Sequence, residues 1–588
     1  IGASAAMMFS MIVAFVTTPW AAHQILGRAF AKGKLKAHHE GEKEDFLTRL
    51  YRLYMGPLIR NAAVRHVFLW ALGGLLVAAM ALVPLKLVRM KMLPFDNKNE
   101  FQVILNMPDE TAIETTKQVI TEVAEYLTTI PEVKDIQLYA GCAAPYNFNG
   151  LVRHYFLRSR THQADLQVNL AAKSDRKRQS HDIAKAVRPK IHEIVSGHGG
   201  HVQIAEIPPG PPVLSTLVLE IYGPTLEGQN EIAREIEKLL ASSEGVTDID
   251  TYVQTPEKLA RLRINTEKAS LNGIPVAQIS ESVAMALGGK AVDLAHLSEE
   301  YEPVEILLRL PKEKRATLES ALNMTLLSRY GNPIPVRELV DLEMDTKDLA
   351  IYHKNLMRVS YVIADVAGKF ESPAYAILKL KKEIAKIPAP KNHESQTKID
   401  QLFNGQPASA DRWTLKWDGE WQITYEVFRD LGIAFAFVLL LIYALVVGWF
   451  QSFKTPWIIM LPIPLTLIGI LPAHWMFGVF FTATSMIGMI AGAGIVVRNS
   501  IILVDFIELQ REAGMPLEEA VIDAGAKRFR PMLLTAAAVV VGAAVILFDP
   551  IFQGLAVALM AGEIASTILS RTAVPVFYYM MAKKEDKA

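Results

Sequence analysis

An arginine interrupts a long apolar stretch toward the C-terminal end of the chain. Residues 494–506 read GIVVRNSIILVDF, so Arg498 lies seven residues before Asp505, about 10 Å along a helix. The Arg498 side chain cannot comfortably reach water over that distance, and a charge at the centre of a membrane helix costs at least about 2.5–3.5 kcal/mol. A partner is therefore expected. Because charges inside membranes usually serve a function, we interpret the segment as an ion or proton site rather than a structural ion pair.

Two further charges, Glu563 and Arg571, lie in the last apolar stretch. A spacing of eight residues is too long for a direct pair on one helix, which needs three or four. The sequence identifies no partner for either residue, so we favour a structural role over a functional one.

A glycine-bounded loop, GCAAPYNFNG, runs from Gly141 to Gly150 and carries Tyr146 and Phe148. Loops of this kind often carry function. It is either a mobile loop beside a substrate path or an ordinary strand connection with partly buried rings, and the sequence leaves both open.

Motifs for metal binding, nucleotide hydrolysis and covalent catalysis are absent from the sequence. His198 and His201 make half a metal site at best, and Cys142 is the only cysteine. No GxxxxGK[ST] phosphate loop and no convincing nucleophile–base pair occur. The sequence therefore predicts a protein that is not an enzyme, needs no cofactor, holds no metal and does not use ATP.

Long apolar segments must position these residues. The chain has 588 residues, of which 51% are hydrophobic and 21% charged. Seven stretches approach the roughly 20 apolar residues that a membrane crossing needs. They are residues 1–25, 66–88, 428–450, 456–473, 481–507, 532–548 and 555–580. Because the chain opens without Met inside the first stretch, we expect a truncated or missing start.

The charges of the connecting loops predict the orientation. Residues 28–65 carry nine Lys and Arg residues. The other basic positions lie on the same side: Lys454, Arg511, Lys527, Arg528, Arg530, Lys583, Lys584 and Lys587. The alternate loops, 474–478 and 549–550, carry none, so the basic side is cytoplasmic and residues 91–427 lie outside. Lys plus Arg equals Asp plus Glu at 61 each, which argues against a nucleic-acid partner.

The region outside the membrane alternates strands and helices. Strands at 101–107, 133–139, 165–170 and 201–207, with helices at 110–129 and 179–195, give the βαββαβ order of a ferredoxin-like fold. The order partly recurs after the connector Pro208–Pro212, with strands 217–222, 246–252 and 358–364 and helices 226–241 and 371–386. An insertion at 288–350 interrupts this second unit. Between the first two spans, residues 43–60 predict an amphipathic helix in the cytoplasmic interface.

The sequence as a whole resembles the acriflavine-resistance (hydrophobe/amphiphile) pumps of the resistance-nodulation-division (RND) superfamily. The most specific matches are residues 494–506 and the motif RFRPMLLT at 528–535. TPW at 18–20, STIL at 566–569 and VPVFY at 574–578 agree with them. The chain resembles the C-terminal half of such a pump, beginning at its sixth membrane helix.

The resemblance implies a membrane α-helical bundle plus an α+β periplasmic domain. About seven transmembrane helices would carry ferredoxin-like βαβ porter subdomains and an inserted docking lobe. The implied parts are a membrane helix 1–27, a cytoplasmic loop 28–65, a membrane helix 66–90, a first porter subdomain 91–213, a second porter subdomain in two pieces, 214–287 and 351–427, a docking insertion 288–350 and a five-helix bundle with a cytoplasmic tail, 428–588.

The resemblance also assigns roles to residues. Arg498 lies where the family has a relay cation, usually lysine, and Thr535 matches its hydroxyl partner. Arg528 matches a basic residue at the cytoplasmic end of the proton path. The aspartates of the relay belong to a helix of the other half. Residues 141–150, with Gly141, Tyr146, Phe148 and Gly150, match the switch loop of the substrate channel. Arginine at 498 and the charges of Glu563 and Arg571 depart from the family pattern.

The implied function is proton-driven export of amphiphilic small molecules from the periplasm or outer leaflet. The family implies a homotrimer in the lipid of the bacterial inner membrane, with a periplasmic adaptor protein and an outer-membrane channel. A heavy-metal cation pump of the same superfamily is the first alternative. Scattered methionines, Met107, Met324, Met344 and Met357, disfavour copper or silver. A non-transporting scaffold or protein-export accessory subunit is the second, and the buried Arg498 argues against it.

Overall fold

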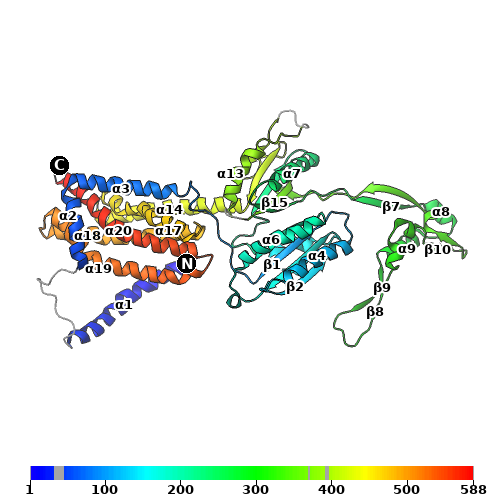
Figure 1. Ribbon diagram of the computed structural model, residues 1–588, viewed down its shortest axis with the longest axis horizontal. Coiled ribbons are helices and arrows are strands. Elements are labelled where there is room, and N and C mark those ends of the chain that lie inside the picture. Colours follow the sequence, from blue (N-terminus) through cyan, green and yellow to red (C-terminus); the bar gives the residue numbers. More distant parts are fainter. Residues whose placement is uncertain (1, 32–45, 368–370, 391–395, 587–588) are drawn as a thin grey trace. The chain divides into compact units, whose positions relative to one another are not determined.

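The computed structural model describes residues 2–31, 46–367, 371–390 and 396–586 (Figure 1). The chain divides into two compact units. Ile1–Met90 with Phe428–Ala588 form the first, which we call the helical unit, and Lys91–Val427 form the second, the sheet unit. The basic residues predicted at 32–45 fall outside the described part of the chain.

The helical unit contains seven helical stretches that are long and apolar enough to cross a membrane, judged by length and composition within the described residues. The helices are α1 (Gly2–Ala31), α3 (Ala62–Ala81), α14 (Glu420–Phe450), α15 (Thr455–Met460), α16 (Pro462–Leu465), α17 (Leu467–Phe477), α18 (Ala483–Glu512), α19 (Leu517–Ala544) and α20 (Gln553–Glu585). Prolines 462 and 464 coincide with the break of the fourth stretch into α15, α16 and α17, because proline removes a backbone donor.

The sixth stretch begins earlier than the sequence predicts. Lys527, Arg528 and Arg530 lie inside α19 and not in a loop before it. The charged first half of α19 is helical because one of its faces is buried: Ala520, Val521 and Ala524 are fully covered. The prediction from hydropathy alone was wrong here because only one stripe of this segment is apolar.

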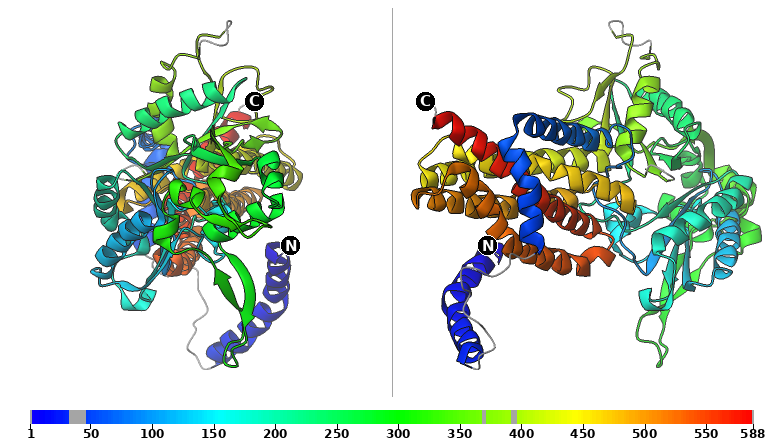
Figure 2. Two further views of the ribbon diagram at one scale, coloured as in Figure 1. Left: turned by 90° about the vertical axis from the view of Figure 1, so that its right-hand side faces the viewer. Right: turned by 60° about the vertical axis from the view of Figure 1, so that its left-hand side comes forward.

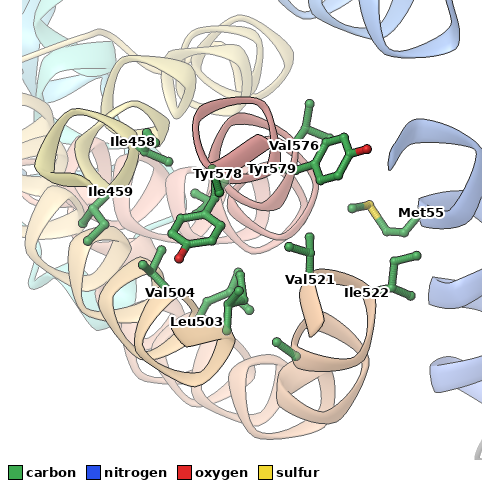
Figure 3. Packing of buried hydrophobic residues seen from close by; sticks show 14 of the residues in the cluster. Met55, Ile458, Ile459, Leu503, Val504, Val521, Ile522, Val576, Tyr578 and Tyr579 are labelled. Atoms are coloured by element: carbon green, nitrogen blue, oxygen red, sulfur yellow. The ribbon is translucent and has the colours of Figure 1, made fainter. Parts of the chain in front are cut away.

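One hydrophobic cluster joins α19 to α2 (Phe46–Arg60), α15, α18 and α20. Figure 3 shows its side chains, with Met55 of α2 facing Ile522 and Val521 of α19 and with Leu503 and Val504 of α18 near Tyr578. The fit is close, because a Cβ at Gly525 would overlap the hydroxyl of Tyr51.

Helix α2 runs across the membrane-type helices rather than along them (Figures 1 and 2). Its two faces differ. Tyr51, Met55 and Ile59 are completely buried in the cluster, whereas Phe46 and Leu53 are more than 70% exposed. The exposed apolar residues suit the predicted place of this helix at a membrane interface.

The sheet unit begins with an antiparallel four-stranded sheet covered by two helices. Its elements are β1 (Glu100–Asn106), α4 (Ile113–Thr128), β2 (Val133–Ala140), β3 (Gln163–Leu170), α6 (Ser180–Gly197) and β4 (His201–Ala205). The strand order β2-β3-β1-β4 is the split βαβ arrangement. Its core is formed by apolar residues such as Val103, Leu166, Val187 and Ile204.

A second sheet repeats this topology with one extra strand. Its elements are β5 (Leu217–Tyr222), α7 (Leu226–Ala241), β6 (Val246–Thr251), β15 (Ser360–Val366), α13 (Pro373–Ile384), β16 (Asp400–Leu402) and β17 (Thr414–Gly419). The order β16-β17-β5-β15-β6 places β5 and β15 at the centre, as β1 and β3 are in the first sheet. Trp413 and Trp417 are fully buried in its core.

The inserted lobe begins at Lys258 and not at residue 288. A two-stranded ribbon, β7 (Lys258–Ile264) with β12 (Val340–Thr346), leads into the lobe. Helices α8 (Thr266–Leu271) and α9 (Val276–Leu287), assigned above to a porter subdomain, pack in the lobe core with Leu322, Val336 and Leu339. The pairing of β7 with β12 explains the difference, because partners that are distant in sequence leave no local signal.

The remaining elements of the lobe are short. They are the hairpin β8 (Lys290–Ala295) and β9 (Val304–Leu308), the helices α10 (Lys312–Arg315), α11 (Leu318–Leu322) and α12 (Val336–Leu339), and the hairpin β10 (Thr325–Leu327) and β11 (Pro333–Pro335). The β8–β9 hairpin projects from the lobe (Figure 1).

Ion pairs join the two sheets of the sheet unit. Asp248 of β6, whose side chain is fully buried, accepts hydrogen bonds from Arg188 at 3.0 Å and from His192 at 2.9 Å, both of α6. Nearby, the ring of His181 lies between Glu206 at 2.8 Å and Glu371 at 3.1 Å, and Lys185 also pairs with Glu371. The two halves are therefore held by buried charges as well as by apolar packing.

Protonation of His181 should govern part of this contact. Burial disfavours the charged ring, but the hydrogen bonds to Glu206 and Glu371 raise the pKa of His181 from 6.5 to about 9. Burial also opposes ionisation of Glu371, yet His181 and Lys185 lower its pKa to about 2. The His181 contribution is therefore complete below about pH 6.5 and is lost as the pH rises through about 9.

We expect His181→Gln to lower the stability of the α6 contact by about 2 kcal/mol at about pH 6 and by much less at about pH 10. Hydrogen exchange of α6 and α13 in both proteins at both pH values measures this. His198→Gln is the matched control, because its pair with Glu122 is exposed and should contribute little to stability at either pH value. An equal effect of His181→Gln at both pH values would contradict the prediction.

Candidate functional site

Helix α18 holds Arg498 near its middle. The helix begins with a reciprocal cap in which Thr482 and Ser485 bond each other's backbone amides. Asn499 and Ser500 are buried against the other helices, whereas the Arg498 side chain is exposed at the side of the described bundle. Within the described residues no hydrogen bond or ion pair engages Arg498, so its partner is not fixed by this chain's own geometry.

Glu563 of α20 is the acid that lies within electrostatic reach of Arg498. It is 2% exposed, and Asn499 of α18 and Thr567 of its own helix adjoin it. The packing of α18 on α20 could not be predicted from the sequence, and the structural role assigned to Glu563 above overlooked this contact. The missed signal was a polar stripe: Ser566, Thr567, Ser570 and Arg571 recur at helical spacing after Glu563.

The polar atoms of this stripe are incompletely bonded within the described part of the chain. Both carboxylate oxygens of Glu563 are buried without a hydrogen bond that meets ordinary geometry. The same holds for Nδ2 of Asn499, Oγ of Ser566, Oγ1 of Thr567, and Nε and Nη2 of Arg571. Arg571 does stack on Phe529, with 4.1 Å from its guanidinium carbon to the ring centre. Buried polar groups are normally satisfied, so such a group suits a hydrated or proton-accepting site.

Thr535 and Arg528 of α19 form no hydrogen bond with the residues of this stripe within the described part of the chain. The Thr535 hydroxyl donates to the carbonyl of Pro531, one turn earlier, at 3.1 Å, and no hydrogen bond joins it to Arg498 among the described residues. Arg528 stacks over Phe506 of α18 at 4.6 Å. The relay roles of both residues stay predictions.

The glycine-bounded loop 141–150 is partly helical. Gly141 has a φ of +73°, a left-handed conformation that favours glycine, and α5 (Phe148–Val152) begins inside the loop. The Asn147 side chain caps α5 by accepting from Gly150 N at 2.7 Å. Tyr146 and Phe148 are 77% and 45% exposed. The structure therefore anchors the backbone of the loop and leaves both rings at the surface.

A cavity of about 920 Å³ lies in the sheet unit beside the segment that follows this loop. Leu157 and His154 reach it, but Tyr146 and Phe148 do not line it. Three tyrosines form one wall: Tyr252 lies 5.2 Å from Tyr352 and 5.3 Å from Tyr361 between ring centres. Sequence reasoning missed these rings, because Tyr252 lies about a hundred residues before Tyr352 and Tyr361 in the sequence.

Charged residues line the rest of the cavity. The cations are Arg153, Arg158, Arg160, Arg234 and Lys238, and the acids are Asp109, Glu237 and Asp250. Burial raises the pKa of Asp250, although it accepts hydrogen bonds from Asn106 at 2.8 Å and Gln203 at 3.1 Å. Burial also lowers the pKa of His162, so that ring is neutral near pH 7. The lining thus offers aromatic faces and charges of both signs.

Two residues that line the cavity, Asp109 and His162, could approach a metal ion together with Glu257. Ligand atoms of Asp109, His162 and Glu257 all lie within 4.8 Å of one another. Their separation in sequence hides them from spacing rules, and His198 and His201, considered above, do not belong to this group. Glu257 is already paired with Arg160 at 2.8 Å and Lys347 at 2.9 Å, which weakens its attraction for a cation.

The chain is similar to known proteins along nearly all its length. The model of the AcrB/AcrD/AcrF family matches residues 1–582. The chain is 23% identical to the swarming motility protein SwrC of Bacillus subtilis, covering 99% of this chain and 51% of that protein. It is 24% identical to the cobalt-zinc-cadmium resistance protein CzcA of Cupriavidus metallidurans, covering 70% of this chain and 36% of CzcA.

A solved structure shares the fold. The crystal structure of a heavy metal efflux pump aligns with a TM-score of 0.72 and 19% identity, covering 92% of this chain and 52% of that chain. The multidrug resistance protein MdtC of Erwinia amylovora is 24% identical over 60% of this chain and 33% of MdtC. The chain thus spans about half the length of SwrC and of the solved pump, and the predicted RND resemblance is confirmed.

Arg158 fixes the wall of the cavity, and its geometry allows a test. It donates to Asp165 at 2.6 Å, Asn106 at 2.7 Å and the Leu105 and Ala164 carbonyls at 2.6 and 3.3 Å. Lysine cannot reproduce this fork, so we expect Arg158→Lys to destabilise the first sheet by about 3 kcal/mol. Thermal melting and hydrogen exchange of residues 100–170 measure this.

Arg160→Lys is the matched control. Arg160 also lines the cavity, but its pair with Glu257 is partly exposed and should contribute at most about 1 kcal/mol. Equal effects of the two substitutions would show that the bonds of Arg158 contribute no more than a surface pair.

Proposed function

This chain belongs to the AcrB/AcrD/AcrF family of RND proteins, and on that premise we propose that it acts in a proton-driven efflux transporter that exports amphiphilic compounds. The proposed function is transport and not enzymatic catalysis. Because the chain spans about half the length of SwrC and of the solved pump, export is a property of the complete transporter. The single observation that carries the choice of substrate is the cavity with its tyrosine wall and its charges of both signs.

The cavity suits molecules that combine an aromatic or apolar body with a charged or polar group. Its volume of about 920 Å³ lies within the range of small-molecule sites, roughly 300–1,000 Å³. Tyr252, Tyr352 and Tyr361 supply rings against which a flat or apolar part of a substrate can stack. The exposed rings of Tyr146 and Phe148 support contact with the same class of cargo outside the cavity.

Proton coupling is supported by the charges of the helical unit. Arg498 keeps its charge at physiological pH and can therefore change partners but cannot carry the proton. Its exposure at the side of the described bundle suits a partner on a helix outside this chain. Arg528, at the end predicted to be cytoplasmic, would act as the basic residue of the proton path, and Thr535 as a further hydrogen-bond partner. The sequence contains no phosphate loop that would point to ATP.

Assembly in the inner membrane as a homotrimer is part of the proposal. The β8–β9 hairpin exposes Val292, Ile306, Leu307 and Leu308 by about half each, and such an unpaired apolar hairpin favours contact with another chain. A periplasmic adaptor protein and an outer-membrane channel would complete the path. The lipid environment is supported by apolar residues exposed on the membrane-type helices, such as Leu440 and Val541.

Export of metal cations is the second candidate. The convergence of Asp109, His162 and Glu257 favours it, and so do the names of CzcA and of the solved heavy metal efflux pump. Copper and silver are disfavoured, because Met107 is the only methionine among the cavity-lining residues. Arg160 and Lys347 already neutralise Glu257, and for this reason we place amphiphiles first.

The relay role of Arg498 is tested by removing or keeping its charge in the complete transporter. We expect Arg498→Ala to abolish proton-gradient-driven efflux in membrane vesicles while the protein remains inserted. Arg498→Lys should retain substantial activity, because the positive charge matters more here than the fork geometry. Arg60→Ala, at an exposed position of α2, is the control and should transport normally. Full activity of Arg498→Ala would leave Arg498 with a structural role only.

The substrate class is tested by two paired variants in cells. Tyr146→Ala with Phe148→Ala should change tolerance to detergents and amphiphilic drugs and leave tolerance to zinc and cobalt unchanged. Asp109→Asn with His162→Gln should leave metal tolerance unchanged. Normal tolerance to amphiphiles in the first variant, combined with metal sensitivity in the second, would establish the metal pump instead.

A further inference from the structure

Glu563 is enclosed by close helix contacts. A Cβ at Gly469 of α17 would lie 2.5 Å from the Ala561 carbonyl oxygen, and one at Gly488 of α18 would lie 2.9 Å from the Leu555 carbonyl oxygen. Both neighbouring helices therefore touch the backbone of α20 within the two or three turns around Glu563. This packing excludes bulk water from an ionisable side chain that is 2% exposed.

Burial and the neighbouring arginines act in opposite directions on the charge of the Glu563 carboxyl group. An ionised carboxylate buried without hydrogen bonds is disfavoured by several kcal/mol, which promotes the neutral acid. Arg498 of α18 and Arg571 of α20 both act on Glu563 electrostatically and promote the carboxylate. Neither forms an ion pair with it within 4.0 Å in the described chain, in contrast to Asp248, whose carboxylate lies 3.0 Å from the Arg188 guanidinium.

The other elements packed on α20 add no acid beside Glu563. His474 of α17 is bonded to the Ile470 carbonyl and the Ser485 hydroxyl. Tyr51 and Tyr54 of α2 adjoin Arg571, and Arg528 of α19 stacks over a ring of α18. Helices α15 and α16 contain no titratable residue.

A polar path continues from Glu563 along one face of α20. Thr567, Ser566 and Ser570 follow, and the Ser570 hydroxyl donates to the Ser566 carbonyl at 2.6 Å. Arg571 comes next, and its carbonyl accepts from the hydroxyl of Tyr51 at 2.9 Å. Because α2 lies in the segment that the loop charges predict to be cytoplasmic, this path leads from the middle of α20 toward the cytoplasm.

We propose that Glu563 is a proton-binding site of the helical unit, which takes up a proton as the neutral acid and releases it along the α20 stripe toward Arg571 and α2. Only an O–H bond forms and breaks. Protonation removes the attraction that Glu563 exerts on Arg571 of its own helix and on Arg498 of α18, and the loss of the second attraction weakens the contact between α18 and α20. Its use in coupling rests on the proposed function, whereas proton binding itself does not.

Proton binding is tested on the purified full-length chain in lipid without any transport. The probe is dicyclohexylcarbodiimide, an apolar reagent that modifies protonated carboxylic acids, and the modified peptide is identified by mass spectrometry. We expect the Glu563 peptide to be labelled at about pH 5 and at least about fivefold less at about pH 9, because the carboxylate does not react. Absent labelling, or equal labelling at both pH values, would overturn the site.

Two variants connect the site to transport. In the complete transporter, Glu563→Gln should remove labelling of this peptide and lower proton-driven efflux at least about tenfold, whereas Glu563→Asp should keep pH-dependent labelling. Glu508→Gln is the control, since Glu508 lies on α18 near its end and should leave efflux unchanged. Unchanged efflux in Glu563→Gln would overturn the coupling role.

The two ideas fail in different ways. If labelling depends on pH but the complete transporter does not use the proton gradient, the proposed function fails and the proton site stands. If efflux is proton-driven but the Glu563 peptide is not labelled, the site fails and the proposed function stands. If Glu563→Gln does not insert, the labelling of the unmodified chain and of Glu563→Asp decides.

Discussion

A charge removed from water must find an opposite charge or hydrogen bonds inside the protein, and this requirement shapes both units of the chain. In the sheet unit several buried charges meet it, although other buried polar atoms there have no hydrogen-bond partner within the described residues. Asp248 is held by Arg188 and His192, and Arg158 reaches four acceptors. These groups are fixed, and they join strands and helices that apolar packing alone would leave free to slide. In the helical unit the requirement is met only in part, because Glu563 and Arg571 retain buried atoms without partners. A buried group with all its partners resists a change of charge, whereas one that lacks partners responds to a proton, and Glu563 is of the second kind.

The close approach of neighbouring helices makes it physically possible to bury the Glu563 carboxyl group with few partners. Gly469 and Gly488 let neighbouring helices touch the backbone of α20 near Glu563, which is 2% exposed, and Gly525 of α19 makes room for the ring of Tyr51. Small residues at helix contacts are the usual means of packing in membranes, where apolar side chains gain little by leaving lipid. The polar stripe of α20 therefore lies on an otherwise tightly packed face. Arg498 of α18 is exposed at the side of the described bundle.

The fold does not decide the substrate class, and the cavity with the loop beside it shows why. The RND fold is shared by relatives named for metals and by one named for multidrug resistance. The local chemistry differs between these uses. Here a tyrosine wall and charges of both signs favour amphiphiles, whereas the convergence of Asp109, His162 and Glu257 favours a metal cation. The aromatic rings of Tyr146 and Phe148 lie at the surface and not in the cavity, so contact with cargo at the loop and contact in the cavity are separate events.

Local patterns in the sequence determined much of this protein. Hydropathy gave the apolar spans, because a membrane crossing is a property of one continuous segment, and the motifs at 494–506 and 528–535 pointed to the family. The alternation of strands and helices likewise follows from short-range periodicity. Tertiary structure alone decided the rest. The lobe begins at Lys258 because β7 pairs with β12, and α19 extends back to Leu517 because Tyr51 of α2 covers its small residues. Glu563 became a candidate only when α18 packed on α20, since electrostatic partners are set by distance in space and nothing in the spacing of Arg498 and Glu563 along the chain encodes that they meet.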